Sequence, residues 1–197
     1  LRRGVITDVE KTVQSVEKAV RQAELTAGTQ VREVFVGIAG EHVTSQDSSG
    51  VVAVAGADGR ITEKDRQRVL ESAGAVKTPI DREVLHVLPQ EFIIDGRRDI
   101  ADPVGMLGVR LEVQVHVVSG AVTAAQNICR SIHRAGLAVR DIALEPLASS
   151  AAVLNSDERQ MGVCLVDIGG GTTDMAVFSR GSLRYTGVIG LGGQNVT

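Results

Sequence analysis

The sequence predicts an α/β fold that carries a small inserted α+β module. After Gly120, apolar residues switch between helical spacing and short strands, which is typical of helices layered on a sheet. Residues 109–118 instead alternate apolar and polar side chains, as an antiparallel strand with one buried face does. These patterns divide the chain into the end of a first subdomain (1–40), the inserted module (41–118), a return to the first subdomain (119–155) and the start of a second subdomain (156–197).

The first segment predicts one helix and one strand. Apolar residues recur at helical spacing over residues 8–27, and Gly28 would end this helix. Thr7 and Glu10 are expected to form its capping box. Residues 34–38 then alternate as a strand does, and a stretch rich in Gly, Ser and Asp marks the junction with the module.

The first half of the module predicts two short strands and a helix. The strands are expected over residues 43–55, with a turn around residues 47–50. Thr62 is expected to cap a helix over residues 63–76. The charged residues 97–99 follow a glycine, and we expect them in a solvated turn.

Two longer strands complete the module. The first, over residues 84–94, contains Pro89, which cannot donate to a ladder and therefore predicts an edge position or a bulge. His116 falls on the polar face of the second strand, where we expect a solvated or capping role. The opposite, apolar face of that strand comprises Val109, Leu111, Val113, Val115 and Val117.

The chain then returns to alternating helices and strands. Residues 122–135 predict a helix that Gly136 ends, and a strand follows near residues 139–144. Pro146 is expected to open the next helix, because proline suits the first helical position.

Composition excludes several classes of function. The 21 Lys and Arg residues against 24 Asp and Glu give a net charge of −3, which argues against a nucleic-acid partner because phosphate neutralisation needs clustered positive charge. No apolar run approaches the ~18 to 20 residues that span a bilayer. Cys129 and Cys164 lack zinc-site or disulfide spacing, so we expect core thiols in a reducing cytosol. The four histidines show no metal-ligand spacing either.

The strongest chemical signal lies in MGVCLVDIGGGTTDMAVFSRGSLRYTGVI, residues 161–189. An apolar strand ends in Asp167, three glycines allow a turn with exposed backbone N–H groups, and Thr172 and Thr173 lead into a second strand. Such a loop suits a phosphate chain, and the Asp167 carboxylate is suited to a hydrated Mg²⁺. The alternative is a plain tight hairpin. Neither a Walker loop nor a Rossmann fingerprint is present, because no GK[ST] occurs and a strand follows.

The segment VDIGGGTTD resembles the second phosphate loop of the actin-like ATPases, which include actin, MreB, heat-shock chaperone ATPases and sugar kinases. Other segments resemble the FtsA family of bacterial cell-division proteins across essentially the whole chain: REVFVGIAGEHV, HVLPQEFIIDG, DPVGMLGVRLEVQVHVV, QNICRSIHRAGL and LEPLASSAAVL. The resemblance implies a partial actin-like (ribonuclease H-like) fold whose inserted α+β subdomain is of the SHS2 type.

The resemblance also implies a site for ATP and Mg²⁺. By matching position, Asp167 would hold Mg²⁺ through water and Thr173 would support the loop, while Glu145 would orient an attacking water. The alternative for Glu145 is a helix N-terminal acid favoured by the dipole. The residues that would contact phosphate or nucleotide are Gly169, Gly170, Gly171 and Thr172 in the loop and Gly192 and Gly193 across the cleft. A simple turn is the alternative for the last two.

In function, the resemblance implies an ATP-binding protein with at most slow ATPase activity, peripheral on the cytoplasmic face of the membrane at the division site. Implied partners are FtsZ, through a part absent from this chain, further copies of the protein in filaments, and later division proteins, through residues 41–118. Membrane attachment would use a C-terminal helix, also absent. Leu1 and Thr197 look like cut ends, so we expect a fragment without ATP hydrolysis. The rivals are a sugar-kinase-like phosphotransferase and a pilus-assembly adaptor.

Overall fold

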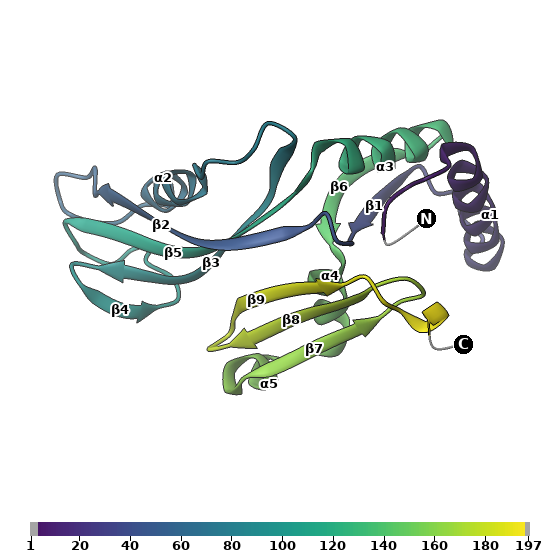
Figure 1. Ribbon diagram of the computed structural model, residues 1–197. Coiled ribbons are helices and arrows are strands. Elements are labelled where there is room, and N and C mark those ends of the chain that lie inside the picture. The colour runs from purple at the N-terminus through teal and green to yellow at the C-terminus, as the bar shows by residue number, and fades with distance from the viewer. Residues whose placement is uncertain (1–3, 196–197) are drawn as a thin grey trace.

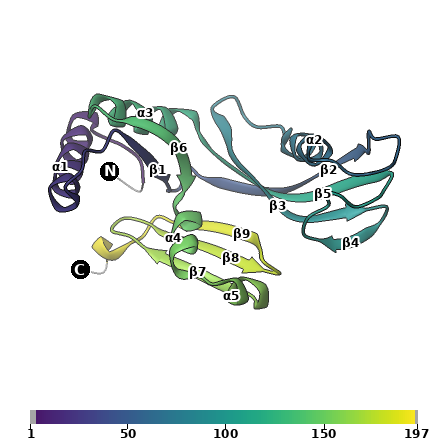
Figure 2. The ribbon, with the colours of Figure 1, turned by 180° about the vertical axis from the view of Figure 1, so that it is seen from behind.

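The computed structural model describes residues 4–195 as an α/β chain with three separate sheets. The expected cut ends at Leu1 and Thr197 lie outside the described residues. Figure 1 shows the inserted module at one end and the paired helices α1 and α3 at the other. The third sheet, formed by strands within residues 163–189, lies below them. The view from behind in Figure 2 has the same arrangement, so the third sheet lies beside both other parts.

The first subdomain pairs two parallel strands under two helices. Strand β1 pairs with β6, and α1 packs on α3. The helices and strands are α1 (Val9–Ala27), β1 (Glu33–Ile38), α3 (Val122–Arg134) and β6 (Ala138–Leu144). Val36, Ile132 and Leu137 form its buried centre. The helix over residues 8–27 is confirmed, but its predicted cap is wrong: Asp8, not Thr7, is the N-cap and accepts the Lys11 amide at 3.0 Å.

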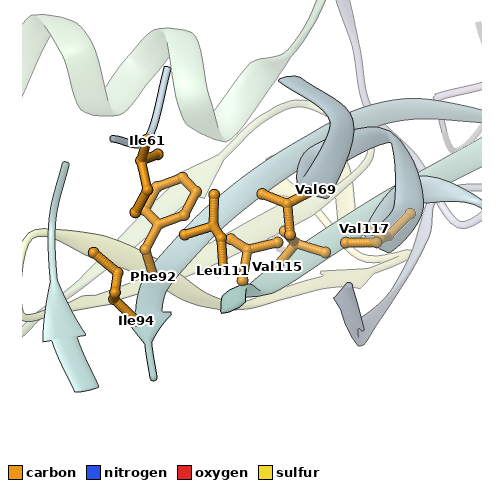
Figure 3. Close-up of a cluster of buried hydrophobic side chains, with 9 residues drawn as sticks. Ile61, Val69, Phe92, Ile94, Leu111, Val115 and Val117 are labelled. Carbon is orange, nitrogen blue, oxygen red and sulfur yellow. The ribbon is translucent and has the colours of Figure 1, made fainter. Parts of the chain in front are cut away.

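The module is a four-stranded antiparallel sheet in the order β2-β5-β3-β4, covered on one face by α2. Its elements are β2 (Thr44–Ala53), α2 (Glu63–Gly74), β3 (Arg82–Ile94), β4 (Arg97–Ile100) and β5 (Arg110–Ala121). Figure 3 shows how residues from β5, β3 and α2 meet in one apolar core. Leu111, Val113 and Val115 are completely buried there, so the predicted inward face of β5 is confirmed at these positions.

Local details of the module depart from three expectations. Residues 44–53 form a single strand, β2, rather than two strands with a turn, because Gly50 stays in the ladder directly under α2. Residues 97–100 form the short strand β4 rather than a turn, although residues 97–99 are exposed to solvent as expected. Val109 lies before β5 and is 76% exposed, so it does not belong to the buried face. The bulge expected at Pro89 is confirmed, since the register of β3 with β5 shifts after that residue.

The last part of the chain is an antiparallel sheet in the order β7-β8-β9 with two short helices on one side. Its elements are α4 (Glu145–Val153), α5 (Ser156–Met161), β7 (Val163–Ile168), β8 (Thr173–Ser179), β9 (Ser182–Ile189) and a 3₁₀ turn, η1 (Gly193–Asn195). Pro146 occupies the first turn of α4, as predicted. Because α4 starts where β6 ends, the N-terminus of α4 lies at the junction between the first subdomain and this sheet.

Candidate functional site

The glycine loop connects β7 to β8 as a hairpin. Asp167 lies opposite Asp174 in the ladder, and the Gly169 amide donates to the Thr172 carbonyl oxygen at 2.9 Å. Within residues 4–195, the amides of Gly170 and Gly171 make no hydrogen bond. Exposed, unpaired amides in a glycine turn form a concave set of donors that suits an anion.

A cavity of about 750 Å³ lies between this loop and the first subdomain. Its polar wall combines the glycine loop with Glu145 from the start of α4 and with residues of the chain after β9. Its opposite wall comes from the first subdomain and combines apolar side chains with the hydroxyl residues Thr12 and Ser131. The residues involved are Glu145, Gly169, Gly170, Gly171, Thr172, Gly190, Gln194 and Asn195 on the polar side, and Val16, Val36, Ile128 and Ile132 on the apolar side. The structure therefore brings the predicted loop and Glu145 to one cavity.

Glu145 is held at the cavity by its position between β6 and α4 and by a close neighbour in β1. A Cβ added at Gly37 would come within 2.8 Å of the Glu145 Cγ atom, so only glycine leaves room for this side chain. Partial burial raises the pKa of Glu145, and the carboxylates of Asp174 and Asp167 raise it further. A carboxylate with a raised pKa facing an anion-binding loop is suited to accepting a proton from water.

Asp167 lies next to the loop but outside the set of described residues that line the cavity. Its Oδ2 atom accepts a hydrogen bond from the Ser149 hydroxyl of α4 at 2.7 Å, which fixes the carboxylate toward the junction. No cluster of three or more metal-binding side chains occurs within the described part of the chain. A Mg²⁺ ion at Asp167 would therefore take most of its ligands from water and from a bound phosphate chain, as Mg²⁺ commonly does.

The remaining predicted residues support the loop from behind. Thr173 donates through its hydroxyl to the Leu191 carbonyl oxygen at 2.8 Å. The Gly193 amide donates to the Gly169 carbonyl oxygen at 2.9 Å. A Cβ on Gly192 would come within 2.6 Å of that same oxygen, which explains a glycine at this buried position. The glycine pair thus packs against the loop backbone and is not among the described residues that line the cavity.

Asp174, the last residue of the motif VDIGGGTTD, lies at the site, although the sequence assigned it no role of its own. It is 3% exposed, and its Oδ1 atom has no hydrogen-bond partner among the described residues. Burial raises its pKa and the nearby Asp167 adds to this, whereas hydrogen bonds from the Thr172 side chain and the Gly40 backbone act in the opposite direction. The sequence does mark this residue in one way: Asp174 is a charged side chain at an alternating position of β8 whose other members, Ala176 and Phe178, are buried.

Two other expectations for individual residues are wrong. His116 is 3% exposed rather than solvated, because its ring lies between Asp47 of β2 and Thr186 of β9. Cys164 is exposed rather than a core thiol, because it lies on the open face of β7. Cys129 is half-buried in α3.

No helix within residues 4–195 has both the length and the apolar character that crossing a bilayer requires.

Two family models match the chain. The model described as "SHS2 domain inserted in FTSA" matches residues 40–119, and the model "Cell division protein FtsA" matches residues 164–197.

Curated relatives extend the similarity over the whole chain. It is 49% identical to "Cell division protein FtsA" of Pseudomonas aeruginosa and 45% identical to that of Bacillus subtilis, each over 100% of this chain. The identity to the Escherichia coli K12 protein of the same name is 40% over 99% of the chain. The chain spans about half the length of these relatives, between 45% and 47%.

Solved structures agree on the fold. A chain of the "PilM-PilN type IV pilus biogenesis complex" superposes with a TM-score of 0.65 at 18% identity, covering 99% of this chain and 52% of that chain. The ethanolamine utilization protein EutJ from Carboxydothermus hydrogenoformans gives 0.50 at 16% identity, covering 99% and 41%. The fold is thus α/β and partly actin-like, with a small inserted subdomain. Because both family models match and the identity to FtsA proteins is 40–49% along its length, the chain belongs to the FtsA family.

Proposed function

We propose that this chain forms one side of an Mg–ATP site in a cell-division protein of the FtsA type. The observation that carries the proposal is the convergence of the glycine loop and Glu145 on one cavity, in a chain with 40–49% identity to FtsA proteins. The unpaired amides of the loop fit the anionic oxygens of a phosphate chain. Among the described residues that line the opposite wall, none carries a carboxylate that would repel the phosphates.

Each residue of the site has a defined part in this proposal. The amides of Gly170 and Gly171 and the Thr172 hydroxyl would bind the β and γ phosphates, while the Gly169 amide, which donates to the Thr172 carbonyl oxygen, closes the loop around them. Asp167 orients a hydrated Mg²⁺ from the position that Ser149 fixes. Bound Mg²⁺ supplies charge neutralisation between the phosphates.

Other side chains act on water and on the loop itself. Glu145 would orient a water molecule toward the γ phosphate and would accept the proton that this water loses, for which its raised pKa is suited. Thr173, Gly192 and Gly193 keep the loop in shape through their bonds and contacts from the far side. Slow hydrolysis fits these residue roles. The nucleotide then acts mainly as a ligand that binds one conformation of the protein more tightly than another.

In the cell, we propose that the protein links FtsZ polymers to the cytoplasmic face of the membrane and assembles into filaments. Contacts with FtsZ and with the membrane would use parts outside this chain, and the module of residues 41–118 would contact later division proteins. A sugar kinase and a pilus-assembly adaptor are less well supported. The PilM match, at 18% identity, shows a shared fold alone, whereas FtsA relatives match at more than twice that identity.

The nucleotide part of the proposal is tested by calorimetric titration of residues 1–197 with ATP and Mg²⁺. We expect saturable binding that Asp167→Ala weakens and that Asp58→Ala, in an exposed turn of the module, leaves unchanged. Absence of binding at millimolar ATP, or equal affinity of the Asp167→Ala variant and the wild type, would contradict the proposed site.

The division role is tested by replacing the matching segment of Pseudomonas aeruginosa FtsA with residues 1–197. We expect the chimaera to support septation and the same chimaera with Asp167→Ala to give filamentous, undivided cells. If the Asp167→Ala chimaera divides normally, the nucleotide site is not needed for division and the proposal fails.

A further inference from the structure

One hydrogen bond connects the inserted module directly to the residue that precedes Glu145. The backbone amide of Leu144, at the end of β6, donates to the Nε2 atom of His86 in β3 at 3.0 Å. Leu144 is also the N-cap of α4, and its own side chain gives no capping hydrogen bond. This amide is buried with the residue, which is 1% exposed, so His86 is its partner at a position that water does not reach.

The direction of this bond fixes the state of the imidazole. A backbone amide only donates, so Nε2 of His86 must carry the lone pair and the ring must be neutral. Burial lowers the pKa of His86, which favours the neutral ring, while the Asp141 carboxylate of β6 acts in the opposite direction. A donor-only side chain such as lysine could not replace histidine here, whereas a glutamine carbonyl could.

Apolar packing surrounds the bond and makes the junction rigid. Leu144 forms a buried cluster with Val43 and Val118, and Leu88 of β3 and Leu147 of α4 pack against it. The module therefore contacts the start of α4 through both a hydrogen bond and a closed apolar contact. On the other side, the Glu145 side chain lies close to the backbone of Gly37 in β1.

We propose that His86, a residue of the inserted module, is a positioning residue for Glu145. It holds the N-terminus of α4 so that the Glu145 carboxylate stays with the glycine loop on the polar wall of the cavity. This inference rests on the proposed function, because it assigns the module a part in the nucleotide site described above. It follows that a partner that displaces β3 changes nucleotide affinity, and that nucleotide binding changes the affinity for that partner by the same factor.

The test compares His86→Leu, His86→Gln and wild-type residues 1–197 by ¹⁵N NMR and by calorimetry with ATP and Mg²⁺. In His86→Leu we expect the Leu144 amide signal to shift and to exchange faster with solvent, and the affinity for Mg–ATP to fall about two- to thirtyfold. His86→Gln should restore both, because its Oε1 atom accepts the same hydrogen bond.

The matched control is His116→Leu, which removes another buried histidine of the module without touching Leu144. We expect it to leave the Leu144 signal in place and to weaken Mg–ATP binding less than His86→Leu does. Equal losses in the two variants would mean general loosening of the module and would overturn the inference. Unchanged affinity in His86→Leu would overturn it as well, while the proposed function would stand. If the wild type itself did not bind Mg–ATP, the proposed function would fall first.

Discussion

Two buried aspartates show how the same side chain takes opposite roles in this chain. Asp65 is 1% exposed in α2 and accepts hydrogen bonds from the Thr62 amide and hydroxyl and from the Ala55 amide. Asp174 is 3% exposed beside the glycine loop, where one carboxylate oxygen has no partner among the described residues. The first site favours the charged carboxylate and the second disfavours it, so their effects on stability have opposite signs.

We expect Asp65→Asn to destabilise the chain by about 2 kcal/mol at neutral pH, because an amide cannot accept all of these hydrogen bonds. Hydrogen bonds from Thr62 are the largest cause of the lowered pKa of Asp65. The stability that this carboxylate contributes is therefore present above its ordinary pKa of 3.8 and is lost as the pH falls through the lower, folded-state pKa. Urea unfolding of both proteins at several pH values should show the difference shrinking in acid; a constant difference would contradict the assignment.

For Asp174→Asn we expect the reverse, a gain of about 1 kcal/mol in unfolding free energy at neutral pH. Burial raises the pKa of Asp174, so the folded state prefers the protonated acid. The stabilising contribution is complete below the ordinary pKa of 3.8 and is lost as the pH rises through the folded-state pKa. The variant should therefore gain most at neutral pH and little near pH 4, measured by thermal unfolding. Asp58→Asn, in an exposed turn, is the control and should change the unfolding free energy by no more than about 0.5 kcal/mol.

At the scale of the elements, local periodicity was enough for β5 and α2. Leu111 and Val113 follow a period of two, and the Thr62 cap with its reciprocal bond to Asp65 is encoded within four residues. Local reasoning failed for β2, whose polar residues around Gly50 suggested a turn. The strand continues because Gly50 brings its backbone against α2, where an added Cβ would come within 2.5 Å of the Val69 carbonyl oxygen. That contact depends on a helix placed by tertiary packing, which no local pattern contains.

The same limit applies to the candidate site. The glycine loop and Asp167 formed a recognisable motif, and Glu145 came from resemblance alone. Ser149 was missed and Asp174 was assigned no role, because their roles depend on which elements meet at the cavity. A serine in the first turns of a helix cannot be recognised as a site residue from the sequence alone, because the acceptor of its hydrogen bond depends on how the elements pack.

The predicted inward face of β5 gives a direct stability test. Leu111 is completely buried in the core that Figure 3 shows, whereas Val109, two residues earlier, is 76% exposed. We expect Leu111→Ala to cost about 2 to 5 kcal/mol, because it removes buried methyl groups and leaves a cavity. Val109→Ala should change stability by no more than about 0.5 kcal/mol. Similar losses in both variants, by urea unfolding, would contradict the placement of the start of β5.

At the scale of the whole molecule, the module is joined to the third sheet by a polar seam. We define this seam as Ser45, Asp47, Gln90 and His116 of the module with Ser182, Leu183 and Thr186 of β9. It lies on the edge strand of the sheet that carries the glycine loop. With the His86 bond, the module therefore contacts both the start of α4, which carries Glu145, and the sheet that carries the glycine loop.

The hydrogen bonds at the centre of the seam predict that substitutions in the module and in β9 affect the free energy of unfolding non-additively. The Nδ1 atom of His116 lies 2.8 Å from the Asp47 carboxylate, its Nε2 atom lies 3.2 Å from the Thr186 hydroxyl, and that hydroxyl donates to Ser45 at 2.9 Å. We expect Thr186→Val to cost about 1 kcal/mol, because it leaves the buried Nε2 atom of His116 without a partner and removes one hydrogen bond of Ser45.

A double-mutant cycle with His116→Phe should then give an interaction energy of about 0.5 to 1.5 kcal/mol between the two positions, measured by urea unfolding. Tyr185→Val, an adjacent and largely exposed position in β9, is the control and should be additive with His116→Phe. If the Thr186 and His116 substitutions were additive too, the hydrogen bonds of the seam would not couple the module to β9.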